Sequence, residues 1–206
     1  MSSNLKLVNR IDLPKIKILF LGYGPEQTSL IDDLACAGCE VWHTAEKIYT
    51  TVGFDLVVSH GFRNILKKEV IESSNAPIIN LHISYLPWNR GAHPNFWSFY
   101  DGTPSGVTIH LIDAGVDTGP VIYQRYVNFV NEENTYSKTY ARLIKEIELL
   151  FRENLSEIIS MKFVTTPQSH KGSYHCAADL PKEFGGWDSD ITAEIARLDN
   201  IGFNGI

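Results

Sequence analysis

The chain has 206 residues, of which 44% are hydrophobic and 20% charged, a composition typical of an ordinary globular protein with one substantial core. No stretch approaches the roughly 20 apolar residues of a membrane-spanning helix, and the N-terminus lacks a signal-peptide pattern, so we expect a cytoplasmic protein without a membrane partner. The formal net charge of −6 disfavours nucleic-acid binding, because phosphate neutralisation usually leaves a basic footprint.

The first third of the chain alternates between strand-like and helix-like segments. Residues 15–22, 39–44 and 54–61 are short apolar runs typical of buried parallel strands. Residues 25–38, between the first two runs, predict an amphipathic helix. This order predicts β-α-β winding.

The pattern continues in the middle of the chain. We expect strands over 76–82, 105–112 and 120–130, and a short helix over 94–102. A long helix is predicted over 135–160, where apolar residues recur on one face: Tyr140, Leu143, Ile144, Ile147 and Leu150.

The last part of the chain has weaker signals. Residues 161–206 carry glycine, proline and aromatic punctuation, and one short helix signal over 189–198. The sequence therefore predicts a doubly wound α/β domain over residues 1–160, with a C-terminal extension over 161–206 packed on the same domain.

Two cysteines form the pair "CAGC", Cys36 and Cys39, in a chain with three cysteines in all. A redox pair usually lies at a helix N-terminus, where the dipole lowers a thiol pKa, whereas this pair follows a helix pattern and carries Gly38. We therefore interpret both cysteines as packing residues at a helix stop, and expect no metal.

The first predicted strand ends in "GYGPEQ", which is similar to a dinucleotide-binding loop. Gln27 stands where the third glycine of that motif should be, and a tight turn explains Gly22 and Gly24 equally well. This motif alone does not support a nicotinamide cofactor.

Polar side chains gather where the fourth predicted strand ends. Asn80 and His82 are two residues apart and point to the same side of an extended strand. A carboxamide can donate to an oxyanion and an imidazole can carry a proton, although a local hydrogen-bond network is the alternative interpretation. Asp113 and Asp117, in a glycine-containing loop after the fifth strand, could bring a carboxylate beside the imidazole.

Three segments carry a resemblance to one enzyme family. "NLHISYLPWNRG" resembles the Asn-x-His-x-Ser-x-Leu-Pro signature of the 10-formyltetrahydrofolate-dependent formyltransferases, and "DAGVDTGPVI" resembles their Asp-Thr-Gly loop. "SHGFRNILKKEVI" resembles the segment whose backbone lines their pterin pocket. The similarity extends over about residues 15–160 with the motifs in the family's order.

The resemblance implies a Rossmann-like sheet of six or seven strands, 10-formyltetrahydrofolate as donor co-substrate and an amine acceptor. It implies Asn80, His82 and Asp117 as catalytic residues: Asn80 and protonated His82 stabilise the oxyanion, and Asp117 orients or charges His82. Whether His82 or Asp117 takes the amine proton stays open.

The resemblance also implies binding residues. Those expected to hold the folate, largely through backbone groups, are Gly61, Phe62, Arg63, Ile65, Ile112 and Asp113. Those expected on the acceptor side are Trp88, Arg90, His93, Asn95, Trp97 and Tyr174, although packing is an equally good interpretation of Trp97 and Tyr174, and helix capping of His93.

The form of the signature loop is most similar to that of the sugar N-formyltransferases, which act on nucleotide-linked amino deoxysugars destined for surface glycans such as lipopolysaccharide. Methionyl-tRNA formyltransferases add a basic barrel-like domain for which residues 161–206 leave no room, and glycinamide ribonucleotide formyltransferases have a different loop. Transfer to another amine, formyltetrahydrofolate hydrolysis and a non-catalytic folate-binding role stay as alternatives, and a homodimer is left open.

Overall fold

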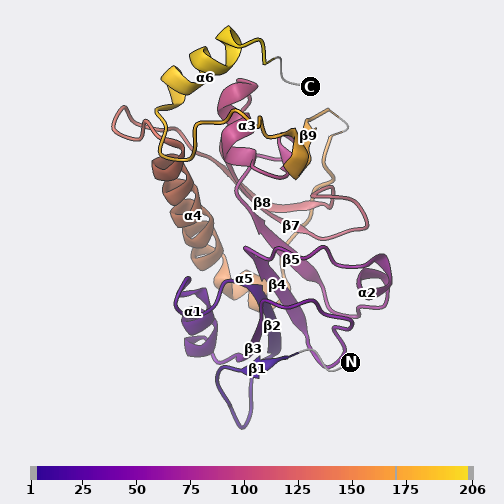
Figure 1. Cartoon of the computed structure of the whole chain (residues 1–206). Helices are drawn as coiled ribbons and strands as arrows, with labels where there is room; N and C mark the ends of the chain where they lie inside the picture. Colours follow the sequence, from indigo (N-terminus) through magenta and orange to yellow (C-terminus); the bar gives the residue numbers. More distant parts are fainter. Residues whose placement is uncertain (1–3, 170, 204–206) are drawn as a thin grey trace.

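The computed structural model describes residues 4–169 and 171–203, within which one large sheet organises the chain (Figure 1). In spatial order its strands are β1 (Lys6–Leu7), β3 (Glu40–Thr44), β2 (Lys17–Gly22), β4 (Leu56–His60), β5 (Ile78–His82), β7 (Gly106–Leu111) and β8 (Val121–Tyr126). β2, β3, β4 and β5 are mutually parallel, β7 is antiparallel to β5, and β8 reverses again, so that only β1 and β7 oppose the rest. The expected mostly parallel sheet of six or seven strands is confirmed.

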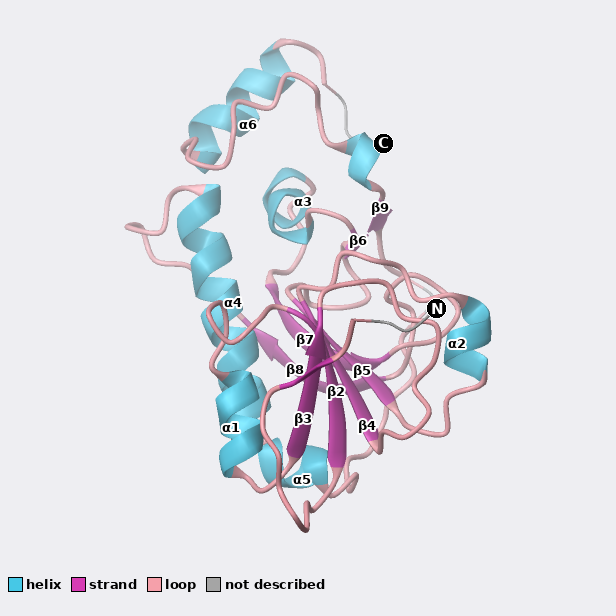
Figure 2. Cartoon of the chain, turned by 60° about the horizontal axis from the view of Figure 1, so that its bottom comes forward, coloured by secondary structure: helices cyan, strands magenta, loops and turns pink. Residues whose placement is uncertain are grey.

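Helices cover the two faces of the sheet unequally. α1 (Leu30–Cys36), α4 (Tyr136–Glu153) and α5 (Leu155–Ile159) lie on one side, and the short α2 (Lys68–Glu72) lies on the other (Figure 2). The larger apolar cluster joins the strands to α1, α4 and α5, whereas a smaller one fills the opposite face. The face that carries only α2 is therefore less covered by helices, and loops can pack there.

The sequence of α4 explains why this segment forms a helix. Its buried residues Leu143, Ile147 and Leu150 recur at helical spacing, and Thr135 caps the first turn by accepting the Lys138 N–H at 3.4 Å. The predicted helix over 135–160 is divided at Asn154, whose side chain donates back to the Leu150 carbonyl at 2.7 Å. Competition of this kind between a side-chain amide and the backbone favours a helix end.

α1 is shorter than the helix predicted over 25–38. Gln27 and Thr28 both donate their N–H groups to the Gly24 carbonyl, so these residues form a turn before the helix begins. The helix ends at Cys36, two residues before the predicted end, and Gly38 follows at φ 88°. Burial raises the pKa of the Cys39 thiol. A buried, protonated thiol matches a packing role for Cys39, whereas Cys36 is exposed and does not pack as expected.

The glycine after β2 serves a close approach between strands. Gly22 has φ 108°, and a Cβ there would lie 2.1 Å from the His60 carbonyl oxygen at the end of β4. Tyr23 then donates its N–H to the same carbonyl at 2.9 Å. This contact accounts for Gly22 without a dinucleotide.

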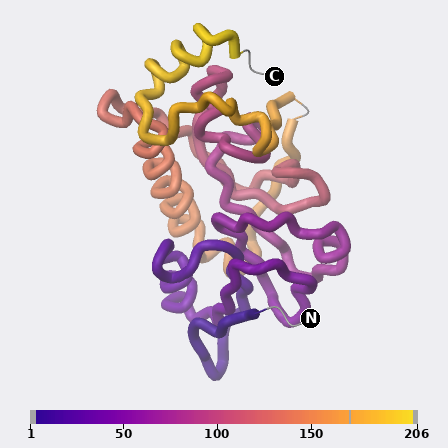
Figure 3. Tube along the Cα trace, viewed as in Figure 1, coloured from indigo at the N-terminus to yellow at the C-terminus, as the bar shows by residue number. Residues whose placement is uncertain are grey.

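The C-terminal segment packs beside α3 (Pro94–Tyr100) and the start of α4, as the yellow end of the trace shows in Figure 3. β9 (Tyr174–His175) pairs with β6 (Arg90–Gly91), and 3-10 helix η1 (Ala177–Asp179) and α6 (Ile191–Asn200) follow. The His175 ring stacks on Trp97 at 3.8 Å and its Nε2 lies 2.8 Å from Asp101. These contacts fix the segment against the helix that follows the signature loop.

Candidate active site

Asn80 and His82 lie on the face of the sheet that has few helices. In β5 they alternate with Ile79 and Leu81, which pack in the cluster with α1 and α4. Because side chains alternate along a strand, Asn80 and His82 share the opposite face with Ile78. The extended strand thus presents a carboxamide and an imidazole on one side, as the spacing predicted.

Asp117 reaches this face by a route that follows from strand direction. β7 is antiparallel to β5, with His82 opposite Thr108, so the loop after β7 starts near the beginning of β5, where Ile112 donates to the Ile78 carbonyl at 2.7 Å. The loop then runs back until Asp117 Oδ2 lies 3.7 Å from His82 Nδ1. The expected carboxylate–imidazole pair is present.

The surroundings of the pair decide how it is charged. Burial lowers the pKa of His82, an effect that Asp117 opposes but does not cancel. Burial of Asp117 would by itself raise the pKa of that carboxyl, but His82, His110 and the Gly91 N–H outweigh it and hold the pKa well below its ordinary range. At neutral pH the pair is therefore a carboxylate beside a neutral imidazole, which corrects the expectation of a protonated His82.

His110, which the sequence interpretation did not include, is part of the same cluster. It lies opposite Asn80 in β7 and is 1% exposed. Its Nδ1 lies 2.8 Å from the Leu111 carbonyl, to which it can donate, and its Nε2 lies 3.3 Å from Asn80 Nδ2 and 3.5 Å from Asp117 Oδ1. The polar alternation of Thr108 and His110 in an apolar strand is the sequence signal that could have identified it.

The loop that carries Asp117 is shaped by short contacts. Asp117 has φ 50°, and its Oδ2 accepts the Gly91 N–H at 2.9 Å. Asp113 Oδ1 accepts the Gly115 N–H at 3.0 Å and the Thr118 hydroxyl at 2.6 Å, so this side chain holds the turn. Gln168 donates to the carbonyls of Asp117 and Gly119 at 2.8 and 2.7 Å, which ties the loop to the C-terminal segment.

The residues predicted to hold the folate lie in two segments, and their side chains differ in exposure. Phe62 and Ile112 pack against the smaller core cluster, and Gly61 has φ 68° with the Tyr23 ring close to its Cα. Ile65, in contrast, is 83% exposed, an apolar side chain that a bound ring could cover. Their contact with folate stays a prediction.

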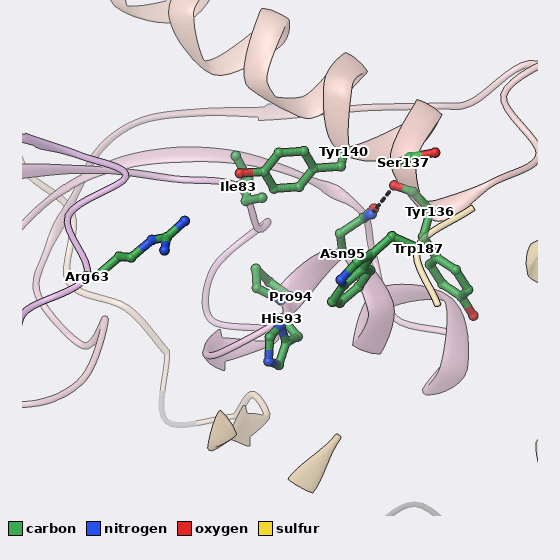
Figure 4. A pocket seen from close by; sticks show the side chains of 9 residues that line it. All are labelled: Arg63, Ile83, His93, Pro94, Asn95, Tyr136, Ser137, Tyr140 and Trp187. Carbon is green, nitrogen blue, oxygen red and sulfur yellow. Dashed lines mark hydrogen bonds between the residues drawn. The ribbon is translucent and has the colours of Figure 1, made fainter. Parts of the chain in front are cut away.

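A cavity of about 500 Å³ is lined by Ile83, the residue after His82, but not by Asn80, His82 or Asp117 (Figure 4). A volume of this size is typical of small-molecule sites. Its lining residues are Arg63, Ile83, His93, Pro94, Asn95, Tyr136, Ser137, Tyr140 and Trp187. Arg63, His93 and Asn95 were candidates from sequence; the contributions of α4 and of Trp187 were missed, because they depend on long-range packing.

The other residues predicted to contact the acceptor lie in or near the strands β6 and β9, which pair with each other. The Arg90 side chain is 3.2 Å from Gln168 Oε1 and 3.4 Å from the Ser169 carbonyl, and Tyr174 is half exposed in β9. Trp97 is fully buried against His175, and Trp88 is half-buried in the signature loop. Packing accounts for the fully buried Trp97 and replaces its expected role on the acceptor side. Contact of the other three side chains with an acceptor stays a prediction.

The described part of the chain contains no group of three or more histidine, cysteine, aspartate or glutamate side chains that could hold a metal ion. Across the same residues, no helix is long and apolar enough to cross a membrane.

Comparison with protein families gives one match, the family described as formyl transferase, over residues 40–153, which is more than half of the chain. The formyltransferase PseJ from Anoxybacillus kamchatkensis is 41% identical, with a TM-score of 0.79, and the match covers 85% of this chain and 96% of that one. Its structure was solved in complex with UDP-4,6-dideoxy-4-formamido-L-AltNAc and tetrahydrofolate. A sugar N-formyltransferase from Shewanella sp. FDAARGOS_354, 20% identical with a TM-score of 0.68 over 83% of each chain, shares the fold.

Curated relatives are similar over a shorter range. The methionyl-tRNA formyltransferase of Thermodesulfovibrio yellowstonii is 35% identical over 135 residues, which are 64% of this chain and 42% of that protein. The corresponding enzyme of Sorangium cellulosum is 34% identical over 134 residues, 65% and 42% of the two chains. The chain thus spans less than half of the length of these relatives.

Proposed function

Because the chain belongs to the formyl transferase family, we propose that it transfers the formyl group of 10-formyltetrahydrofolate to the amine of a nucleotide-linked amino deoxysugar. The observation that carries the reaction type is the cluster of Asn80, His82 and Asp117 on one face of β5. The cluster combines a hydrogen-bond donor, a neutral base and a fixed anion, the set that acyl transfer to an amine requires.

Two comparisons bear on the acceptor class. The PseJ structure, with a formamido sugar nucleotide and tetrahydrofolate, matches almost the whole of that chain at 41% identity. The methionyl-tRNA formyltransferases match over less than half of their length. The match to PseJ, together with the net charge of −6, supports a sugar nucleotide over tRNA. A formamido sugar of this kind would serve surface glycan synthesis.

In the proposed mechanism the free amine attacks the formyl carbon, and a tetrahedral intermediate forms with its charge on the formyl oxygen. Asn80 donates a hydrogen bond to this oxyanion. Collapse of the intermediate breaks the bond between the formyl carbon and the folate nitrogen, which takes up a proton as it leaves. The products are the formamide and tetrahydrofolate.

The charges of the pair support His82 as the group that takes the amine proton. The lowered pKa of His82 makes its imidazole a neutral base before the reaction, whereas the strongly acidic Asp117 carboxyl is a poor one. In the proposal, His82 takes the proton from the attacking amine and passes it to the folate nitrogen. Asp117 stabilises the imidazolium that exists between these two steps.

The test is a turnover assay with 10-formyltetrahydrofolate and a panel of UDP- and dTDP-linked 3-amino and 4-amino deoxysugars, following tetrahydrofolate release with and without each acceptor. Release that depends on one amino sugar, with a formamide product by mass spectrometry, is the expected result. Methionyl-tRNA in the same assay tests the second candidate acceptor, and His82→Ala is the matched inactive control.

The outcomes separate the alternatives. Release at the same rate without acceptor would identify a hydrolase and overturn the transfer. Release only with methionyl-tRNA would replace the sugar acceptor. Folate binding without release under any condition would contradict the catalytic role of the cluster.

A further inference from the structure

We propose that Trp187, together with His93, forms an aromatic platform that stacks on the base of the acceptor nucleotide at the outer end of the cavity. This inference rests on the proposed function for the identity of the ligand. It assigns a binding role to Trp187, a residue of the C-terminal segment that lies far from the family motifs in sequence.

Trp187 is placed as a fixed wall rather than as a loose surface residue. Its ring packs edge-on against Phe184 at 4.8 Å and Tyr136 at 6.3 Å. Its carbonyl accepts the Ser137 N–H at 2.8 Å, and the Ser137 hydroxyl donates to Asp188 at 2.6 Å. The first turn of α4 therefore holds the indole in position, yet 41% of Trp187 stays exposed.

His93 extends the platform. Its ring centroid lies 5.4 Å from that of Trp187, at an interplanar angle of 37°. Burial lowers the pKa of His93, so at neutral pH it is an uncharged aromatic ring. Its backbone has φ 54°, an unfavourable conformation for a non-glycine residue, directly before Pro94. Strain of this kind recurs where a side chain must be held in one direction at a functional site.

The position of the platform within the cavity indicates that it contacts the base of the nucleotide sugar and not the sugar. Figure 4 shows Arg63 on one side of the cavity and Trp187 on the other, with Ile83 and Tyr140 between them. Arg63 belongs to the segment expected to hold the folate. Ile83, the residue after His82, lines the cavity between Arg63 and Trp187, whereas Asn80, His82 and Asp117 are not among its lining residues. A nucleotide sugar with its amine at His82 extends away from the folate, which brings its other end, the base, to Trp187.

Asn95 supplies an independent indication of a polar ligand at this end. It is 3% exposed and lines the cavity, and its Nδ2 donates to the Tyr136 carbonyl at 2.9 Å. Its Oδ1 has no hydrogen-bond partner within the described residues. A buried acceptor without a partner is costly, and an N–H of a stacked base is the type of donor that would satisfy it.

The test measures binding of uridine diphosphate and of tetrahydrofolate by calorimetry to the wild-type protein, Trp187→Ala and Trp187→Phe, with melting temperatures as a folding check. Loss of a stacked ring is expected to weaken uridine diphosphate binding at least about tenfold in Trp187→Ala, and no more than about threefold in Trp187→Phe. Tetrahydrofolate affinity should stay within about twofold in both. His93→Asn, which tolerates positive φ, should produce a smaller loss in the same direction.

Uridine diphosphate affinity in Trp187→Ala equal to that of the wild type would overturn the platform, as would an equal loss of tetrahydrofolate affinity. Because binding is measured apart from turnover, the two proposals fail separately. If Trp187→Ala turns over an amino sugar with an unchanged KM for that sugar, the platform is refuted and the proposed reaction stands. If the wild type shows no turnover but its uridine diphosphate binding depends on Trp187, the proposed reaction is refuted and the platform stands.

Discussion

Replacement of Asp117 by asparagine tests the electrostatic assignment of the site most directly. The carboxylate oxygen lies 3.7 Å from His82 Nδ1. At that separation, with an effective dielectric constant of about 20, one unit charge stabilises an imidazolium by roughly 4 kcal/mol. Asp117→Asn removes this stabilisation while keeping nearly the same volume, so the pKa of His82 should fall further.

A weaker base removes the amine proton more slowly, and we expect kcat to fall about 100-fold to 10,000-fold. The assay is steady-state release of tetrahydrofolate with acceptor, and the pKa of His82 is read by an NMR titration of the imidazole. D101N is the matched control, because it removes the charge from a histidine–aspartate pair outside the reacting groups, Asp101 with His175. Its kcat should stay within about threefold of wild type, since no proton in the mechanism reaches it.

The same variant has a signature in stability. The pKa of Asp117 is lowered by folding, so its charge stabilises the native state above the ordinary aspartate pKa of about 4, and this contribution is lost as pH falls below that value. The melting temperature of Asp117→Asn should therefore be lower than wild type at pH 7, and the difference should shrink toward pH 3. Activity within tenfold of wild type, or a His82 pKa that does not fall, would refute the reasoning.

Three further substitutions probe the neighbours of the pair. Asn80→Ala should cost roughly 3 kcal/mol of transition-state stabilisation, measured as kcat/KM, and a loss of tenfold or less would contradict an oxyanion role. His110→Gln should lower kcat by about tenfold and shift its pH profile while KM for folate stays constant; an unchanged profile would indicate that His110 only fills space. Gly119→Ala places a Cβ 1.8 Å from the Leu111 carbonyl oxygen, so the melting temperature and kcat should both fall, and a stable, fully active variant would show that the loop is not rigid.

The elements that carry the core were predictable because their signals are local. Alternation and short apolar runs located β2, β4 and β5 within a few residues of their observed bounds, and helical spacing located the start of α4. The two-residue β1, β6 and β9 carry no such signal, since each exists only through its pairing with a distant segment. The division at Asn154 was missed because it depends on one side-chain hydrogen bond.

The site residues likewise fall into those that local patterns predict and those that long-range packing places. Spacing placed Asn80 and His82 on one side of a strand, and a motif linked them to Asp117, but neither reveals that β7 is antiparallel. That direction makes the loop cross the sheet face and sets His110 opposite Asn80. Trp187 reaches the cavity only because α6 and its approach pack on α3 and α4, which no local pattern indicates.

The contacts of Asn80 explain how a donor can be held ready for an oxyanion that does not yet exist. Its Nδ2 lies 3.3 Å from both Asp117 Oδ1 and His110 Nε2, so the two amide hydrogens are engaged. The opposite amide orientation would set Oδ1 against the Asp117 carboxylate, which excludes it. Both contacts are long, and exchanging one of them for a bond to the oxyanion costs only about 1 kcal/mol or less. The bond gained is to a full negative charge and is therefore stronger, so the exchange favours the transition state over the ground state.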